Sequence, residues 1–263
     1  MRSIKLQSHG DLLKDDLKLA IARENEVLRG LIGSEAHGTN IPGKGDRDEL
    51  GIYVEPKPQA LGLSTFDHHV YRSVGNHNSP SRTGDLDLTY HSARKFLRLC
   101  AGGNPTMLLL LWLPEYLSKT EAGELMVQNR DLFTTRRAGR SFRGFMGKVL
   151  REMPRDDDLG YHPKSAMHAL RLGIQGRALL ETGVMPVPLK DSDRKWLTDV
   201  RLGLYSLAEI SNMVEEAESA IKNVIETYAG PEQVDLSAVN SLFVDVHEAH
   251  WDSVPAPVNR WCS

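Results

Sequence analysis

The chain has 263 residues, of which 40% are hydrophobic and 25% charged, a composition that supports one large or two modest domains with a real core. Its formal net charge of −3 argues against a wholly basic nucleic-acid binder, although a local basic patch is still compatible with it. Two cysteines, Cys100 and Cys262, cannot build a disulfide framework. The longest apolar run, Met107 to Leu113, is too short to span a bilayer, and the N-terminus lacks the apolar core of a signal peptide. We therefore expect a cytoplasmic protein with no membrane partner.

The N-terminal half predicts a mixture of helices and strands. Residues 1 to about 30 predict a helix, because apolar side chains recur there at spacings near 3.6. Glycine and proline in residues 30–56 exclude a continuous helix and favour a strand, a turn and a second strand that includes 50–54. Short strands are predicted at 70–74 and 84–90, and a helix at about 92–101. Asn104 is predicted to cap a short buried helix that begins at Pro105.

From about residue 120 the pattern is helical almost throughout. The predicted helices cover 120–130, 135–153, 163–182, 191–203 and 206–229, and the tail from Gly230 stays mostly unassigned. The fold class that follows is an α/β (α+β) domain with a small mixed β-sheet, followed by an all-α domain. The predicted boundaries are 1–120 for the first domain, 121–230 for the helical domain and 231–263 for a C-terminal extension.

Closely spaced carboxylates are the most informative polar residues. Asp46 and Asp48 are two residues apart, so on a strand both side chains point to the same face. Neighbouring carboxylates repel each other unless a cation lies between them, and Mg²⁺ prefers oxygen ligands. Asp85 and Asp87 repeat this spacing on a second predicted strand. One of them could complete a cradle for two metal ions of the kind used for displacement at phosphorus.

Gly33 and Ser34 lie at a predicted turn upstream of these carboxylates. A glycine there lets backbone amides approach a phosphate, and the serine hydroxyl adds a donor. The whole segment, GSEAHGTNIPGKGDRDELGIYV, resembles the signature of the DNA polymerase β-like nucleotidyltransferase superfamily. Two later segments, GDLDLTYHSARKFLRLCAGGNPTMLLLLW and HPKSAMHALRLGIQGRALLETGV, resemble one branch of it, the predicted nucleotidyltransferases of an RNA repair pathway family in bacteria and phages. The resemblance covers roughly residues 25 to 185.

The resemblance implies a catalytic site with metal. Asp46, Asp48 and Asp87 would be catalytic residues and ligands of two Mg²⁺ ions, with Mn²⁺ as an alternative, and Asp87 rather than Asp85 would be the third carboxylate. Asp87 would also be the candidate base for an attacking hydroxyl. The residue between the paired aspartates is usually apolar in the superfamily, whereas here it is Arg47. We expect Arg47 to face away from the metals, toward solvent or Glu49.

The resemblance also implies a nucleotide site. Gly33 and Ser34 would contact the phosphates of the nucleotide, and Lys164 and His168 lie on the helix that carries Lys, His and Arg in this branch. Lys164, His168 and Arg171 are spaced four and three residues apart and so share one helical face. That face is either a solvated basic stripe or a wall of the cleft that meets a triphosphate.

Basic residues are concentrated between 130 and 155. Four of them are the candidate nucleic-acid contacts, Arg136, Arg140, Arg143 and Lys148. They fit either a solvated helix face or contacts to a phosphate backbone. The residues after 205 are acidic instead, an asymmetry expected when only one side of a protein faces nucleic acid.

Together these patterns predict a metal-dependent nucleotidyltransferase. It would transfer a nucleoside monophosphate from an NTP such as ATP to a hydroxyl acceptor, with an RNA end preferred, and release pyrophosphate. The enzymatic alternative is nucleotidylation of a protein partner such as a toxin. The other alternative is a non-catalytic nucleotide-binding module. The clustered carboxylates argue against it, because a site that has lost catalysis has no reason to retain side chains that repel each other.

Overall fold

A five-stranded mixed sheet forms the N-terminal part of the protein. The computed structural model describes residues 15–41, 47–63, 66–73, 85–154 and 158–253. Within them the sheet has the order β3-β4-β2-β1-β5. The strands are β1 (Glu26–Leu31), β2 (Arg47–Tyr53), β3 (His68–Arg72), β4 (Leu86–Ser92) and β5 (Ser118–Lys119). β2 and β4 run parallel and the other pairs antiparallel, so the predicted small mixed sheet is confirmed.

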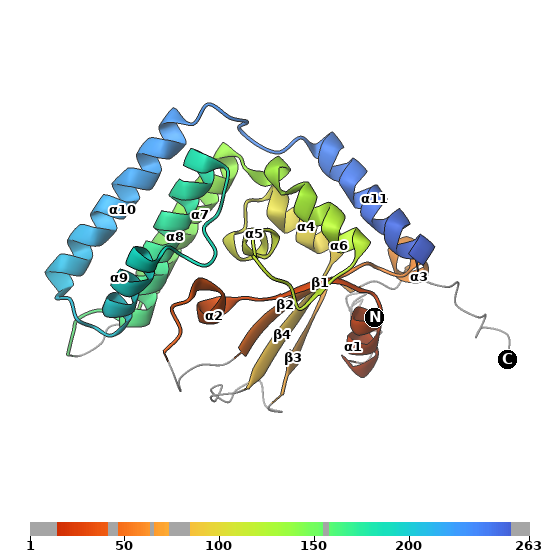
Figure 1. The fold of residues 1–263 in the computed structure, drawn as a ribbon, viewed down its shortest axis with the longest axis horizontal. Coiled ribbons are helices and arrows are strands. Elements are labelled where there is room, and N and C mark those ends of the chain that lie inside the picture. The colour runs from red at the N-terminus through yellow and green to blue at the C-terminus, as the bar shows by residue number, and fades with distance from the viewer. Residues whose placement is uncertain (1–14, 42–46, 64–65, 74–84, 155–157, 254–263) are drawn as a thin grey trace, which may run out of the picture.

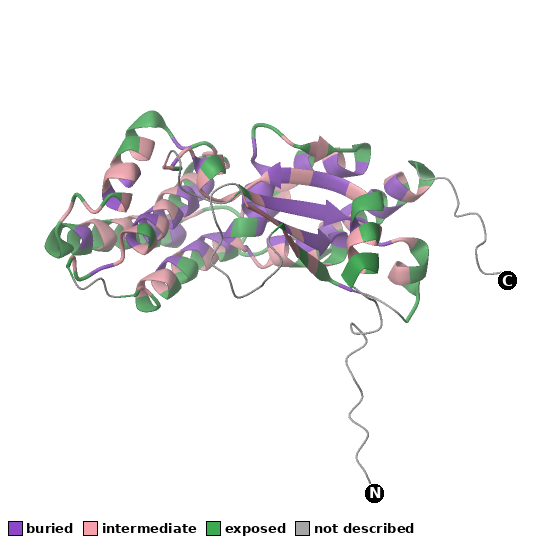
Figure 2. Cartoon of the chain, turned by 90° about the horizontal axis from the view of Figure 1, so that it is seen from below, coloured by how far each residue is buried: buried purple, intermediate pink, exposed green. Residues whose placement is uncertain are grey.

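The two faces of the sheet pack differently because side chains alternate along each strand. On β2, Leu50 and Ile52 enter the main core, which α4 (Ala93–Ala101), α5 (Pro105–Leu111) and α6 (Glu121–Gln128) complete. On the opposite face a smaller cluster joins Tyr53 to residues of β4 and of α1 (Asp15–Glu24). Figure 1 shows these layers, with α4, α5 and α6 above the sheet and α1 below it. The strands are largely buried between them (Figure 2).

The C-terminal half is helical, as predicted. α8 (Pro163–Thr182) lies at its centre and packs against α7 (Arg136–Arg151), α9 (Asp191–Arg201) and α10 (Leu207–Thr227). The 3-10 helix η2 (Arg130–Phe133) leads into α7. Two short helices, α2 (Gly33–His37) and α3 (Lys57–Leu61), flank the N-terminal strands.

Two N-caps show how sequence fixes these helix starts. The predicted cap at Asn104 is confirmed, since its Oδ1 accepts from the backbone N–H groups of Thr106 at 3.0 Å and Met107 at 3.3 Å. Ser206 begins α10 with a capping box closed by Glu209. These side chains satisfy backbone donors that the first helical turn leaves without intrahelical partners.

Two predictions of secondary structure need correction. The first helix ends at Glu24 instead of about residue 30, and Val27 and Leu28 are fully buried in β1 between β2 and β5. Their apolar spacing also suits a buried strand, and pairing on both sides decides between the two. The unassigned tail contains a long helix, α11 (Leu236–Ser253), which packs against α6 and α4. The first part of the predicted N-terminal helix, residues 1–14, lies outside the described residues. So do residue 74 of one predicted strand and residue 84 of the other. The domain boundaries stay predictions.

Close packing inside the bundle gives a test of the fold. A Cβ on Gly176 of α8 would lie 2.5 Å from Phe142 Cβ and 2.8 Å from Ile221 Cδ1, whereas a Cβ on Gly144 of α7 would meet no atom within 4 Å. We expect Gly176→Ala to lower the free energy of unfolding by about 1–3 kcal/mol through overpacking. Gly144→Ala should raise it by about 0.5–1 kcal/mol through helix propensity. Urea denaturation measures both, and equal effects would contradict the packing described.

Candidate active site

Asp48 and Asp87 lie side by side in the sheet. They are register partners on the parallel strands β2 and β4, so their side chains project from the same face. Asp87 Oδ1 also forms an ion pair with Arg72 Nε at 3.5 Å. Asp85 precedes β4, and its carbonyl accepts from the backbone N–H of Arg47 at 2.8 Å. The register therefore places Asp87, the preferred third carboxylate, level with Asp48.

Asp46 lies outside the described residues, directly before β2. Among the residues that the structure does describe, no group of three or more His, Cys, Asp and Glu side chains could hold a metal ion. The predicted three-carboxylate metal site therefore stays a prediction. Its described members, Asp48 and Asp87, present two hard oxygen donors from adjacent strands, which is chemistry that suits Mg²⁺.

Gly33 brings the turn after β1 against the Asp48 carboxylate. Its φ is +68°, and an added Cβ would lie 2.2 Å from Asp48 Oδ2. A glycine is required here both for the left-handed backbone and for the space beside the carboxylate. The backbone N–H of Ile32 donates to Asp48 O at 2.9 Å and fixes the approach of the turn. Gly33 and Ser34, which the sequence predicts at a turn, are therefore the first two residues of the short helix α2.

Arg47 faces away from Asp48, as expected. Its Nε lies 2.6 Å from Glu49 Oε1, and Arg29 Nη1 lies 2.6 Å from Glu49 Oε2. Glu49 is only 3% exposed, so two guanidinium groups neutralise an almost fully buried carboxylate. Because Glu49 follows Asp48 directly on β2, this ion-pair cluster occupies the face of the sheet opposite the two aspartates.

A cavity of about 200 Å³ lies between the two halves of the chain. Its walls are Gly33, Ser34, His37, Thr39, Asp48, Lys164, Met167, His168, Arg171 and Arg201. Three basic side chains, Lys164, Arg171 and Arg201, converge on it, and Asp48 is its one acidic wall residue among those described. Of the two interpretations left open for the face of α8, the geometry supports the wall of a cleft.

Three polar cavity residues, and the apolar Met167, were not identified from the sequence. His37 and Thr39 belong to the same GSEAHGT segment as Gly33 and Ser34, so their proximity was a usable signal. Arg201 had no local signal, because the packing of α9 against the α2 region brings it there. Its Nη1 donates to the carbonyl of Thr39 at 2.5 Å. In Figure 1, α9 lies next to α2.

Burial controls the charge of the cavity's titratable groups. Burial, and then the positive charges of Arg171 and Lys164, lower the pKa of His168 to about 4. Burial lowers the pKa of Arg171 to about 10, which leaves the guanidinium charged at neutral pH. The cavity therefore combines permanent cations with an uncharged imidazole at neutral pH.

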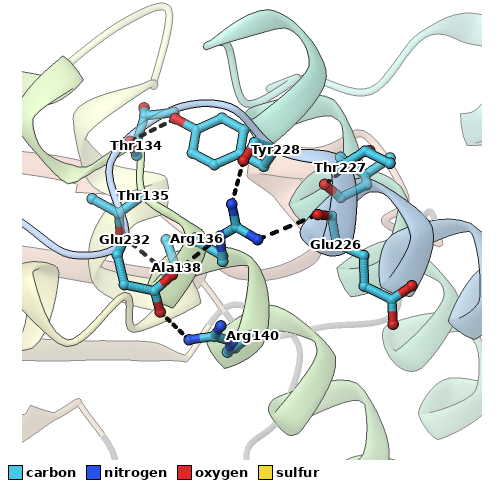
Figure 3. A network of polar contacts seen from close by, with 10 residues as sticks. Thr134, Thr135, Arg136, Ala138, Arg140, Glu226, Thr227, Tyr228 and Glu232 are labelled. Carbon is cyan, nitrogen blue, oxygen red and sulfur yellow. Dashed lines mark hydrogen bonds and ion pairs between the residues drawn. The ribbon is translucent and has the colours of Figure 1, made fainter.

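The candidate nucleic-acid contacts on α7 bind other parts of the same chain (Figure 3). Arg136 donates to the carbonyls of Glu226 at 3.3 Å and Tyr228 at 2.5 Å, and its Nε lies 3.1 Å from Glu232 Oε2. Arg140 pairs with the other oxygen of Glu232. These contacts fasten the segment after α10 to the start of α7.

The remaining two cations of this set also have acidic neighbours. Arg143 Nη2 lies 2.8 Å from Glu218 Oε1 on α10, and Lys148 Nζ lies 4.0 Å from Glu152 Oε2. The acidic residues after 205 thus include the internal partners of the basic stretch. Contact between these four cations and an RNA backbone stays a prediction.

The sequence model of the RNA repair pathway DNA polymerase beta family matches residues 16–245. The chain belongs to this family. The fold and the family together mark a nucleotidyltransferase-like protein, as the sequence resemblance implied. Along the described part of the chain, no helix combines the length and apolar character needed to cross a membrane.

Two further similarities accompany the family match. The chain is 27% identical over 126 residues to an uncharacterized 38.9 kDa protein of Enterobacteria phage T4, an alignment that covers 46% of this chain and 37% of the phage protein. The chain thus matches little more than a third of that relative's length. A nucleotidyltransferase-like protein from Exiguobacterium sibiricum 255-15 aligns over 89% of this chain and 75% of its own, with 11% identity and a TM-score of 0.29.

Burial of His168 makes the stability of this protein sensitive to acid. The pKa of His168 is about 4 in the folded protein against 6.5 for the free side chain, so between these values the unfolded chain binds more protons. The contribution of neutral His168 to the free energy of unfolding is complete above 6.5, the pKa of the side chain in the unfolded protein. It is lost as the pH falls toward about 4, the pKa in the folded protein. Between about pH 7 and about pH 5 we expect His168 to account for a loss of about 2 kcal/mol.

Urea denaturation of the wild type and His168→Gln at the two pH values tests this. The variant should lose less stability on acidification than the wild type, because Gln does not titrate. Carboxylates that titrate in the same range affect both proteins alike and cancel in the comparison. Parallel losses in the two proteins would show that His168 is not held neutral by its surroundings.

The network of Arg136 predicts a stabilising role. We expect Arg136→Ala to lower the free energy of unfolding by about 1.5–3 kcal/mol, since two carbonyls and Glu232 lose a charged donor. Lys148→Ala is the matched control and should change stability by less than about 0.5 kcal/mol, because its ion pair is long and exposed. If Arg136→Ala left stability intact and weakened RNA binding instead, the nucleic-acid interpretation would replace the structural one.

Proposed function

We propose that this protein transfers a nucleoside monophosphate from an NTP to a hydroxyl acceptor and releases pyrophosphate. One observation carries the proposal: a single cavity joins the Gly33–Ser34 turn and Asp48 to the cationic side chains of α8 and α9. A triphosphate needs positive charge and backbone amides, and its reacting phosphorus needs nearby carboxylates. The cavity brings the cations of the helical half together with the Gly33–Ser34 segment and the carboxylate of Asp48, whose register partner Asp87 lies beside it.

Asp48 and Asp87, together with Asp46, would hold the divalent metal. The residues fit such an ion, because two carboxylates project from the same face of adjacent strands, and Gly33 lacks the Cβ that would displace the carboxylate of Asp48. Members of the family generally use divalent metals, and we propose two Mg²⁺ ions, with Mn²⁺ as an alternative. Such ions supply Lewis-acid stabilisation of phosphoryl charge and lower the pKa of an attacking hydroxyl.

The chain's own residues then have distinct roles. Lys164, Arg171 and Arg201 would neutralise the phosphates, and Ser34 would donate a hydrogen bond to them. His168, uncharged at neutral pH, would contribute hydrogen bonding without adding charge. Asp87 would accept the proton of the attacking hydroxyl, a role that its position level with Asp48 supports.

We propose an RNA end as the acceptor hydroxyl. The description of the family as part of an RNA repair pathway supports this choice. The basic stretch on α7 adds little to it, because its arginines have internal acidic partners. Nucleotidylation of a protein is therefore kept as an outcome of the experiment.

The experiment uses the four NTPs, each labelled at the α-phosphate, with Mg²⁺ and either total RNA or a cell lysate. We expect label on RNA that ribonuclease removes. Label that protease removes would replace the RNA acceptor by a protein, and no transfer to either acceptor would overturn the proposed reaction.

Asp48→Asn is the matched inactive variant. We expect it to reduce transfer by about 100-fold or more, since it weakens a proposed metal ligand. Its free energy of unfolding should be unchanged or higher, because it removes one of two neighbouring like charges. Near-wild-type transfer by a folded Asp48→Asn protein would contradict the assignment of this residue.

A further inference from the structure

Three polar atoms in the walls of the candidate active site have no hydrogen-bond partner in the described part of the protein. Among the described residues, a small set of buried side-chain nitrogens and oxygens has no hydrogen-bond partner, and three of them belong to cavity walls. They are His37 Nε2, Thr39 Oγ1 and Arg171 Nε. A buried donor without a partner is costly, so native proteins keep few of them. Three such atoms around one cavity indicate groups that a bound ligand satisfies.

His37 is the most constrained of the three. It is 1% exposed at the end of α2, and Gln175 of α8, 3% exposed, lies against it. Gln175 Nε2 is 3.3 Å from His37 Nδ1 and 3.1 Å from the carbonyl oxygen of Pro186. The imidazole is thus held between the N-terminal turn and the central helix of the bundle.

The carbonyl of Pro186 settles which atom of the Gln175 amide is the nitrogen. A carbonyl oxygen only accepts, so the amide must present its NH₂ group there and not its oxygen. That nitrogen carries two hydrogens and cannot accept, and therefore His37 Nδ1 must accept from it. The proton of the neutral ring consequently resides on Nε2, the atom that has no protein partner.

We propose that His37 is a ligand-binding residue of this cavity and that its uncharged ring donates a hydrogen bond from Nε2 to a phosphate oxygen of the nucleotide. Gln175 is the positioning residue that fixes the required tautomer. The inference rests on the proposed function, since it takes the cavity to be the triphosphate site.

The surroundings favour an uncharged donor. Burial and the positive charge of Arg171, followed by His168, hold the pKa of His37 well below its usual value. Lys164, Arg171 and Arg201 attract any anion, whereas a fixed N–H also demands an acceptor in one direction. The three cations would therefore attract the negative charge of the phosphates, and His37 would fix the position of one phosphate oxygen.

Nitrogen-15 NMR of the histidine side chains tests the tautomer in the ligand-free protein. His37 should show a protonated Nε2 and an unprotonated Nδ1 at neutral pH, with the signal assigned by its loss in His37→Phe. In Gln175→Glu the new side chain presents acceptor oxygens, so we expect the ring proton to move to Nδ1. A protonated Nδ1 in the wild type would overturn the role given to Gln175.

Calorimetric titration tests the ligand contact. The probes are the Mg²⁺ complexes of the α,β-methylene analogues of the four NTPs, which bind without turnover. For the analogue that binds the wild type most tightly, His37→Phe and Gln175→Glu should each raise the Kd about tenfold, through loss of one charge-assisted hydrogen bond. His91→Phe is the matched control, because His91 is also buried but does not line the cavity, and its Kd should stay at the wild-type value.

The outcomes separate this inference from the proposed function. If the wild type binds an analogue and folded His37→Phe binds it equally well, the role of His37 is overturned and the nucleotide site stands. A tautomer change in Gln175→Glu without weaker binding would likewise overturn it. If the wild type binds none of the four analogues, the proposed function itself is overturned.

Discussion

The contact between α8 and the turn after β1 holds the candidate site together. His37 and Gln175 are 138 positions apart in the chain, yet both are almost fully buried against each other. Arg201 adds a second link, across 162 positions, through the carbonyl of Thr39. Without this docking the glycine-serine turn would lie beside Asp48 but would face no cations. The cavity therefore depends on how the helical half packs on the sheet.

That packing is supported at a distance by the segment that joins α10 to α11. Arg136 binds the carbonyl of Glu226 at the end of α10, and in the joining segment it binds the carbonyl of Tyr228 and the carboxylate of Glu232 (Figure 3). Tyr228 in turn donates to the carbonyl of Thr134 at 2.9 Å. α11 then returns to the sheet domain, where Trp251 Nε1 donates to the carbonyl of Glu55 at 3.0 Å. The chain thus runs from the helical bundle back to the sheet that carries Asp48 and Asp87. This return restrains the helical bundle relative to the sheet.

Charged side chains fall into two groups, those that pair with each other inside the protein and those that lie at the candidate site. On one face of β2 the carboxylate of Glu49 is neutralised by two arginines, and on the other face Asp48 and Asp87 lie next to each other. The arginines of α7 are largely neutralised by Glu218 and Glu232, whereas the cations of α8 and α9 converge on a cavity. Basic residues with internal partners stabilise the fold, and those that line a cavity are available to a ligand.

The sequence by itself determined the mixed sheet and most helices of the second half, because alternation, capping and turn residues act over a few neighbours. It also singled out Gly33, Ser34 and Asp48 as candidate site residues. It placed Lys164, His168 and Arg171 on one helical face and could not say what that face meets. Only the tertiary structure decided that Val27 and Leu28 lie in an interior strand of the sheet, and that His37 and Arg201 line the cavity. It also decided that Arg136 fastens a distant segment. The physical reason is that strand pairing, burial and ion pairing depend on partners that here lie as far as 90 to 162 positions away in the chain, which no local spacing specifies.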